Sequence, residues 1–278
     1  MKIVFFGNTK HSLIGAEIIH KELGLSLVVT IPQSPLEKFA GEEKIPYLLV
    51  TKLTDEEIAK IAEVQPDFLV VEDYGLILPT KLLEVPKYAS LNIHHSLLPK
   101  YRGPAPAPAA ILAGDKTSGV SIIKMSNKVD AGAIFAQTEY VLKPDETTDS
   151  LLNELNLLGG NLAVSVINDI LQDKAKAVPQ DESKATLTKY MQKSDGYIDL
   201  SQLEIKNFEL KIGRMVRAYF PWPGAWTRSI VNNKSSIIKF LPQKKLQVEG
   251  GKLMTYKDFL NGYPNADKKL VEFLKNNL

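Results

Sequence analysis

Short apolar runs alternate with segments of helical periodicity along the first hundred residues, and this alternation limits the fold more than any other feature. Each apolar run has the length of a buried strand, and the segments between them repeat apolar residues at intervals of three or four. Such alternation is typical of a mostly parallel sheet with helices on both faces, so we predict an α/β fold. The predicted strands are Lys2–Phe6, Leu25–Thr30, Asp67–Val71 and Ser90–Ile93, and the predicted helices are Ser12–Glu22 and Asp55–Val64.

The pattern changes character in the second half of the chain. A polar stretch from Gln172 to Asp199, which contains Pro179, is typical of a domain linker. Beyond it, short apolar segments separated by Asn-Asn, Pro and Gly-Gly turns predict a small β-barrel or sandwich. The predicted elements are strands at Gly119–Lys124, Ala133–Tyr140, Ala225–Val231, Ser236–Phe240 and Lys245–Val248, and helices after Pro108, over 147–172 and at Ile205–Tyr219.

We therefore expect a first domain over residues 1–178, a linker over 179–204 and a smaller domain over 205–278, which a chain of 278 residues can accommodate. The absence of cysteine excludes disulfides and thiolate metal ligands and agrees with a reducing compartment. The beginning of the chain does not have the pattern of a signal peptide, and no stretch approaches the roughly 20 apolar residues that span a bilayer. A soluble, cytoplasmic protein is expected.

Charge is distributed unevenly along the chain. Residues 207–278 contain 13 Lys and Arg and 5 Asp and Glu, an excess of eight positive charges, whereas residues 1–206 contain 21 basic and 27 acidic residues. A basic segment attached to an acidic one favours contact with a polyanion. A solvated, lysine-rich surface would produce the same count, so both readings remain open at this point.

The densest cluster of unusual residues follows the predicted strand at Ser90–Ile93. Ligands of open parallel sheets bind beyond the carboxyl ends of the strands. Because side chains alternate along a strand, Asn92 and His94 are expected on the same side, whereas His95 is expected to be an exposed loop residue. The apolar stretch Leu97-Leu98-Pro99 would suit a flat heteroaromatic ligand.

Asp130 is the third candidate, because it follows the predicted strand Gly119–Lys124 and stands beside the small residues Ala131 and Gly132. A carboxylate paired with His94 would raise the pKa of the imidazole and keep a proton available near neutrality. An amide, an imidazole and a carboxylate together suit acyl transfer to an amine. Each residue also has a purely structural reading, as a hydrogen-bonded histidine, a loop cap and a turn residue. No spacing of His, Asp and Glu predicts a metal site.

The strings Asn-Ile-His-His-Ser-Leu-Leu-Pro at 92–99 and Asp-Ala-Gly at 130–132 resemble the folate-dependent formyltransferase family. The resemblance implies a Rossmann-like α/β domain and 10-formyltetrahydrofolate as formyl donor, with no metal. It implies that Asn92 and His94 stabilise an oxyanion, and that Asp130 orients His94 and assists proton movement. The folate pocket implied by the resemblance is formed by Ser96, Leu97, Leu98 and Pro99.

Further segments are similar to the branch of that family that acts on initiator methionyl-tRNA, and they cover nearly the whole chain. This branch implies a basic, OB-like second domain that holds tRNA, and formyl transfer to the α-amine of methionyl-tRNA for translation initiation. One departure favours an amino-sugar nucleotide as the alternative substrate, because the loop after Thr30 lacks the basic, glycine-containing insertion of the tRNA branch. The similar segments are Lys2–Gly7, Val71–Pro79, Tyr101–Pro106, Asp195–Asp199, Arg217–Trp226 and Met254–Gly262.

Overall fold

The computed structural model of the chain describes residues 1–202 and 208–276 and divides into two compact units. Unit 1 comprises Met1–Pro106, Thr117–Val141 and Leu152–Lys189, and unit 2 comprises Ala107–Lys116, Leu142–Leu151 and Tyr190–Leu278. The division near Lys189 falls inside the stretch predicted as a linker. The domain boundaries predicted from the sequence remain predictions.

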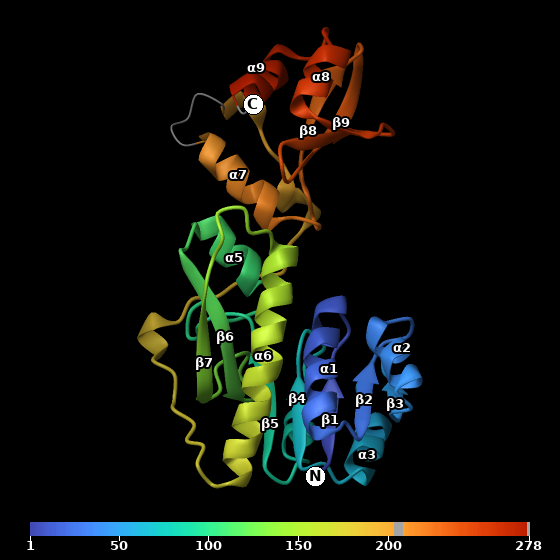
Figure 1. Cartoon of the computed structure of the whole chain (residues 1–278), viewed down its shortest axis with the longest axis vertical. Helices are drawn as coiled ribbons and strands as arrows, with labels where there is room; N and C mark the ends of the chain where they lie inside the picture. The colour runs from blue at the N-terminus through green and yellow to red at the C-terminus, as the bar shows by residue number, and fades with distance from the viewer. Residues whose placement is uncertain (203–207, 277–278) are drawn as a thin grey trace. The chain divides into compact units, whose positions relative to one another are not determined.

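Unit 1 is built on a seven-stranded sheet of order β3-β2-β1-β4-β5-β6-β7 (Figure 1). The five strands from β3 to β5 are parallel, and β6 and β7 add antiparallel partners at one edge. The predicted α/β fold with a mostly parallel sheet is therefore confirmed. The strands are β1 (Ile3–Phe6), β2 (Leu27–Thr30), β3 (Tyr47–Leu49), β4 (Phe68–Val71), β5 (Ala89–His94), β6 (Thr117–Lys124) and β7 (Ile134–Val141).

Helices cover both faces of this sheet because the buried strands carry apolar side chains in both directions. Alternate residues of β1 belong to different cores: Ile3 and Phe5 pack with α1, α2 and α6, whereas Val4 and Phe6 pack with α3 and α4. The bounds of these helices are α1 (Lys10–Leu23), α2 (Pro35–Glu42), α3 (Asp55–Glu63), α4 (Thr80–Leu83) and α6 (Thr148–Leu171), and α5 (Pro106–Ala113) belongs to unit 2 from Ala107 onwards.

Helix α2 and strand β3 occupy a stretch for which the sequence predicted only a loop after Pro32 and Pro35. Pro35 starts α2 instead of breaking a helix, since the first helical position needs no amide hydrogen. The Ser34 hydroxyl accepts the Glu37 amide and caps this helix. Residues 31–34 therefore form the whole connection between β2 and α2.

Unit 2 contains a four-stranded antiparallel sheet of order β11-β10-β9-β8, which agrees with the predicted small β domain. Its helices pack on the sheet around Phe240, Phe259 and Phe273, all of which are almost fully buried. Residues 205–207 of the predicted helix Ile205–Tyr219 lie outside the described residues. The elements are α7 (Phe208–Ala218), β8 (Ala225–Val231), β9 (Lys234–Leu241), β10 (Lys245–Val248), β11 (Leu253–Thr255), α8 (Tyr256–Gly262) and α9 (Lys268–Asn276).

No helix within residues 1–202 and 208–276 is both long and apolar enough to cross a membrane.

Replacing Phe240 by alanine should destabilise unit 2 by about 3–5 kcal/mol, because a large buried aromatic leaves a cavity when it is truncated. Phe240 is 2% exposed and meets the Phe273 ring edge-to-face at 5.2 Å. Urea unfolding followed by tryptophan fluorescence measures the loss. The neighbouring Lys239 is exposed, so Lys239→Ala is the matched control and should change the free energy of unfolding by less than about 0.5 kcal/mol. Equal losses in both variants would contradict the assigned core.

Candidate active site

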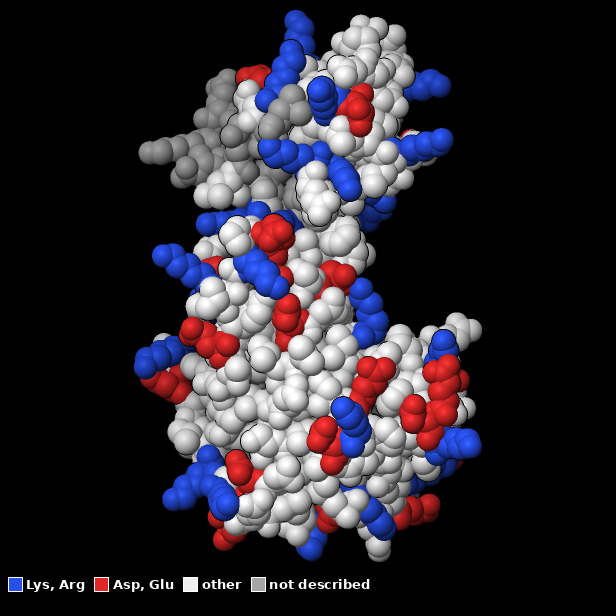
Figure 2. Space-filling model, viewed as in Figure 1, with Lys and Arg blue, Asp and Glu red and all other residues white. Residues whose placement is uncertain are grey.

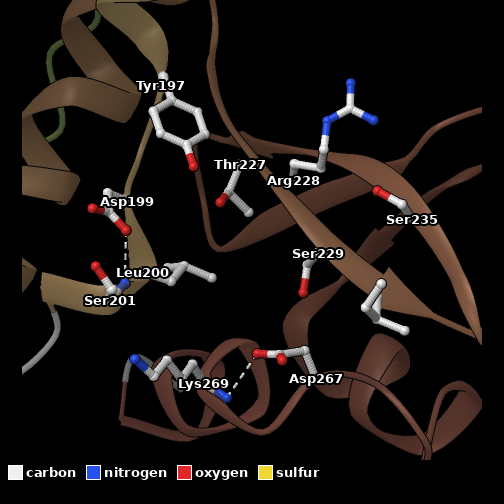
Figure 3. A pocket seen from close by; sticks show the side chains of 11 residues that line it. Tyr197, Asp199, Leu200, Ser201, Thr227, Arg228, Ser229, Ser235, Asp267 and Lys269 are labelled. Carbon is white, nitrogen blue, oxygen red and sulfur yellow. Dashed lines mark hydrogen bonds between the residues drawn. The ribbon is translucent and has the colours of Figure 1, made fainter.

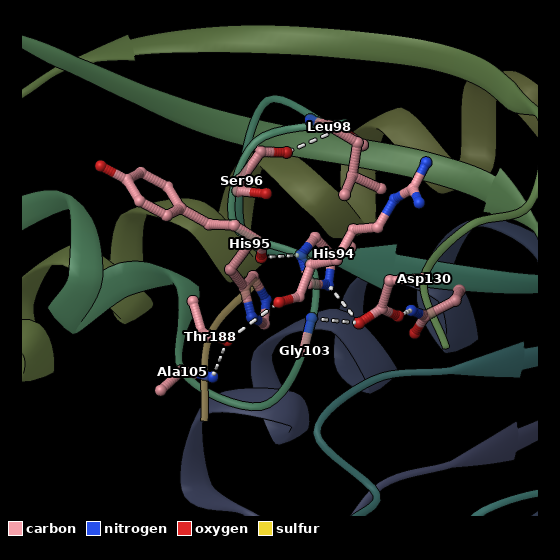
Figure 4. Close-up of polar contacts among 12 residues, drawn as sticks. His94, His95, Ser96, Leu98, Gly103, Ala105, Asp130 and Thr188 are labelled. Carbon is pink, nitrogen blue, oxygen red and sulfur yellow. Dashed lines mark hydrogen bonds and ion pairs between the residues drawn. The ribbon is translucent and has the colours of Figure 1, made fainter. Parts of the chain in front are cut away.

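Strand β5 ends at His94, and the alternation predicted for this strand is observed. Asn92 and His94 both contact Asp130: the Asn92 amide donates to Oδ1 at 3.1 Å, and His94 Nδ1 lies 3.6 Å from Oδ2 (Figure 4). All three side chains belong to unit 1, and the His94 and Asp130 side chains are only 6% and 15% exposed. The structure thus brings together the three residues that the sequence singled out, although 38 positions separate Asn92 from Asp130.

Asp130 has a positive φ of 49°, in the left-handed region that few side chains adopt. Hydrogen bonds from two other segments stabilise this turn. The Gly103 amide donates to Oδ2 at 2.8 Å, and the side-chain amide of Gln180 donates to the Asp130 carbonyl at 2.7 Å. These contacts keep the carboxylate directed at β5.

The His94 ring is fixed by its second nitrogen. Nε2 lies 2.9 Å from the carbonyl oxygen of Tyr101. A carbonyl oxygen can only accept, so Nε2 carries the hydrogen, and Nδ1 of the neutral ring presents its lone pair towards Asp130. The main chain of the loop after β5 therefore determines which nitrogen of His94 can take up a proton.

The charge of Asp130 raises the pKa of His94 as expected, but the net shift of that pKa is downward, so the expectation that a proton stays on His94 near neutrality is wrong. Burial lowers the pKa of His94 below its ordinary value, and the charge of Asp130 opposes this shift without reversing it. His94 is therefore neutral near pH 7. This state suits a group that accepts a proton.

His95 is not the exposed loop residue expected from the sequence, because only 3% of its surface is exposed. Its Nε2 lies 3.4 Å from Glu72 and its Nδ1 lies 3.4 Å from Asp73. Both carboxylates follow β4, the parallel neighbour of β5, so the ends of the two strands bring the charges together. Two acidic residues directly after one buried strand and a histidine directly after the next were the signal in the sequence.

The charges of this cluster are mutually dependent. Burial alone would lower the pKa of His95, but Asp73 and Glu72 outweigh it and raise that pKa to about 10. Burial raises the pKa of Glu72 to about 8, and the charge of His95 holds the pKa of Asp73 below its ordinary value although burial opposes this. Near pH 7 the cluster holds a His95–Asp73 ion pair beside a neutral Glu72. An added Cβ at Gly15 would approach Glu72 Oε2 to 2.0 Å, so the absence of a side chain there leaves room for this carboxyl group.

The segment after His95 forms a tightly hydrogen-bonded turn. The Ser96 hydroxyl donates to the Lys100 carbonyl at 2.6 Å, and the Leu98 amide donates to the Ser121 hydroxyl at 3.1 Å. Gln137 of β7 donates to the Leu98 carbonyl. Leu98 is 3% exposed, whereas Leu97 and Pro99 are half-buried. The turn therefore offers partly exposed apolar surface on a rigid backbone.

A cavity of about 240 Å³ lies within unit 2, and none of the three candidate residues lines it (Figure 3). The carboxylates of Asp199 and Asp267 line this cavity, and each accepts a hydrogen bond from a main-chain amide two residues further along the chain, that of Ser201 and that of Lys269. We assign it no ligand. Within the described parts of the chain, no group of three or more His, Asp and Glu residues is placed to hold a metal ion.

An α/β sheet that carries an amide, an imidazole and a carboxylate at the end of β5 is compatible with acyl transfer to an amine. The chain belongs to the formyl transferase family, whose sequence pattern matches residues 3–167. It is 36% identical over 241 residues to a methionyl-tRNA formyltransferase of Roseiflexus castenholzii, covering 82% of this chain and 75% of the relative. A methionyl-tRNA formyltransferase of Nitrosomonas eutropha is 31% identical over 306 residues, covering 95% of each chain.

Solved structures share the fold at lower identity. HypX from Aquifex aeolicus, solved in complex with tetrahydrofolic acid, aligns with a TM-score of 0.63 at 20% identity over 86% of this chain and 37% of that one. An N-formyltransferase from Helicobacter canadensis, solved with folinic acid and dTDP-3-aminofucose, aligns with a TM-score of 0.62 at 19% identity. The alignment covers 92% of this chain and 98% of that one.

The buried cluster predicts an unusual dependence of stability on pH. The pKa values of Glu72 and His95 are both raised above those of the unfolded chain, so their contribution is complete at low pH and is lost as pH rises through about 8 and 10. Glu72→Gln, a neutral mimic of the protonated acid, should flatten the decline in the free energy of unfolding between about pH 4.5 and 8. Urea titrations across that range measure it. The surface variant Glu63→Gln should follow the wild-type curve, and a Glu72→Gln curve parallel to the wild type would contradict the assignment.

Proposed function

We propose that this protein transfers the formyl group of 10-formyltetrahydrofolate to the α-amino group of initiator methionyl-tRNA, in the cytoplasm, for translation initiation. The observation that carries the proposal is the convergence of Asn92, His94 and Asp130 at the end of β5 in a chain of the formyl transferase family. The relatives named methionyl-tRNA formyltransferase support the choice of acceptor. The folate compounds bound in HypX and in the Helicobacter canadensis enzyme support the choice of donor.

The reaction forms a bond between the amine nitrogen and the formyl carbon and breaks the bond between that carbon and the folate nitrogen. The amine must lose a proton, and the departing nitrogen must gain one. The resemblance implied that His94 stabilises the oxyanion, but its Nε2 hydrogen is bonded to the Tyr101 carbonyl. In this proposal His94 serves both proton steps instead: its Nδ1 accepts the proton and then returns it. The neutral state of His94 near pH 7 suits the first step, and the Asp130 carboxylate at 3.6 Å stabilises the imidazolium in between.

Asn92 supplies a hydrogen-bond donor to the oxygen on which negative charge develops. One hydrogen of its amide is directed at Asp130 Oδ1. The second has no partner among residues 1–202 and 208–276, so it is available to a substrate oxygen. A donor fixed in advance by a carboxylate needs little rearrangement when the charge appears. In this proposal Asp130 therefore holds both Asn92 and His94 in place.

The folate contacts in this proposal come from Ser96, Leu97, Leu98 and Pro99. Leu97 and Pro99, three and five residues after His94, keep part of their apolar surface exposed, which fits a flat ring system with polar edges. Ser96 is 1% exposed and its hydroxyl is bonded to the Lys100 carbonyl, so it contributes by holding the turn that carries the other three.

A solvent-facing surface of the unit 2 sheet supports tRNA as the partner. Alternation along β8 and β9 directs Arg228 and Lys239 away from the core, and Lys245 of β10 follows on the same face because it pairs with Leu241. Trp226 pairs with Lys239 on this face and adds an aromatic ring. On the face drawn in Figure 2, Lys and Arg side chains outnumber acidic ones over the C-terminal part of unit 2, at the top of the view. Cations beside an aromatic ring on an open sheet suit a nucleic-acid backbone.

An amino-sugar nucleotide is the alternative acceptor. The short connection at residues 31–34 favours it, because this connection leaves no room for a basic insertion after β2. The two acceptors are separated by incubating the protein with 10-formyltetrahydrofolate and either methionyl-tRNA or an amino-sugar nucleotide. Formylation of the sugar alone would overturn the main proposal.

Asn92→Ala, His94→Ala and Asp130→Asn should each lower kcat for formyl-methionyl-tRNA synthesis by about 10²–10⁴, since they remove the donor, the proton-transfer group and the charge that stabilises the imidazolium, respectively. Incorporation of labelled formyl into methionyl-tRNA measures the rate. Asn161→Ala is the matched control, because Asn161 is exposed on α6 and should retain wild-type activity. Wild-type kcat in a folded His94→Ala variant would exclude the proposed proton transfer.

Binding of tRNA should weaken steeply with salt, because phosphate contacts release counterions. Replacing Arg228, Lys239 or Lys245 by alanine should each reduce the slope of log affinity against log salt by about one unit if that side chain neutralises one phosphate. Fluorescence anisotropy with labelled tRNA measures the slope. Lys52→Ala, an exposed lysine of unit 1, should leave it unchanged. An unchanged slope in all three variants would remove this face from the proposal.

A further inference from the structure

Residues 178–188 run alongside two segments of the candidate active site: the loop after β5, which contains Arg102 and Gly103, and the turn between β6 and β7, which contains Asp130. Val178 exchanges two main-chain hydrogen bonds of 2.8 Å with Ile134, at the start of β7 and four residues after Asp130. Further along, the Arg102 amide donates to the Thr186 carbonyl at 2.9 Å and the Thr188 amide donates to the Arg102 carbonyl at 2.7 Å. A polar stretch of unit 1 with no apolar periodicity is therefore bonded to the chain on both sides of the site.

Contacts at Gly103 show how closely this segment approaches. Gly103 has a φ of 105°, and an added Cβ would lie 2.8 Å from the Thr188 carbonyl oxygen. The Thr188 hydroxyl also receives the Ala105 amide at 3.1 Å (Figure 4). The Gly103 amide is the group that binds Asp130 Oδ2, so the 178–188 segment fixes one of the donors that orient Asp130.

Gln180 joins the two loops through one side-chain amide. Its Nε2 donates to the carbonyl oxygens of Asp130 and Gly132, both at 2.7 Å. Its Oε1 accepts Arg102 Nε at 2.9 Å. Arg102 is 5% exposed, and its two terminal nitrogens form a bidentate pair with Glu182 at 2.9 and 2.8 Å. The chain of contacts thus runs from Glu182 through Arg102 and Gln180 to the Asp130 turn.

The orientation of the Gln180 amide follows from its partners. A guanidinium nitrogen can only donate, so the atom that faces Arg102 must be the oxygen. The two carbonyls can only accept, so the atom that faces them must be the nitrogen, which has one hydrogen for each. Glutamate at this position would direct an oxygen at two carbonyl oxygens. Asparagine is one methylene shorter, so its amide cannot span the same three partners.

We propose that Gln180 is a positioning residue for formyl transfer, which joins the Asp130 turn to the Arg102 loop and thereby sets the placement of the Asp130 carboxylate against the His94 ring. This inference rests on the proposed function. Gln180 touches no reacting atom in this assignment, and it acts through two main-chain carbonyls. Its effect is large because the left-handed Asp130 turn depends on outside contacts and because catalysis is sensitive to displacements of about 1 Å, which can cost about 10²-fold in rate.

The test compares Gln180→Met with wild type. Methionine keeps the length and neutrality of the side chain and removes all three hydrogen bonds. We expect kcat to fall by at least about tenfold, with KM for the tRNA substrate unchanged, since the tRNA-binding face is elsewhere in the proposal. Gln180→Glu should be at least as impaired. Gln172→Met, at an exposed glutamine just after α6, is the matched control and should behave as wild type.

A second readout needs no substrate. The charge of Asp130 is one of the influences that raise the pKa of His94, so a displaced Asp130 should let that pKa fall further in Gln180→Met. Imidazole NMR titration with labelled histidine measures the shift, and thermal unfolding shows that each variant is folded. Wild-type kcat together with an unchanged His94 titration in folded Gln180→Met overturns the inference. Wild-type protein that formylates neither acceptor overturns the proposed function instead, and the two failures are therefore distinguishable.

Discussion

The Asp130 carboxylate is the interaction on which the site depends, because groups from β5 and from the loop that follows it meet on it. Asn92 and His94 approach from β5, and the Gly103 amide approaches from the following loop. A carboxylate with little exposure is costly unless its lone pairs are satisfied, and the Asn92 side-chain amide and the Gly103 main-chain amide donate to it beside the His94 ring. The strained backbone of Asp130 is tolerated because the surrounding contacts determine its conformation.

The sheet explains why the two adjacent histidines behave differently. His94 is the last residue of β5, and its ring faces Asp130 and the Tyr101 carbonyl. The next side chain in the chain, His95, faces the carboxylates that follow β4. Burial acts on both rings and favours the neutral form. At His94, which faces one carboxylate, burial has the larger effect and the pKa is lowered. At His95, which lies between two carboxylates, their charges have the larger effect and the pKa is raised.

Local patterns predicted much of this arrangement. The alternation of β5 placed Asn92 and His94 on one side, and the position of Asp130 after a predicted strand and beside two small residues made it the third candidate before the family resemblance supported it. The helix at Pro35 was missed because a proline can start a helix as well as break one, and only the Ser34 cap distinguishes the two. Gln180 and the burial of His95 depend on partners far away in sequence. The Gln180 bond to Asp130 spans 50 positions and the His95 contact with Glu72 spans 23, and no periodicity reports such pairings.

The cluster of Glu72, Asp73 and His95 links the stability of the fold to the protonation of His94. A positive His95 lowers the pKa of His94, whereas Asp73 and Asp130 raise it, so the ring that accepts the proton lies between opposing charges. If His95 were neutral, His94 would bind a proton more readily and would less often be free to accept one from an amine. The His95–Asp73 ion pair therefore holds β4 and β5 together at their ends and also favours the proton-accepting form of His94. Since both effects come from the same pair of side chains, a change at His95 or Asp73 should alter folding and proton transfer together.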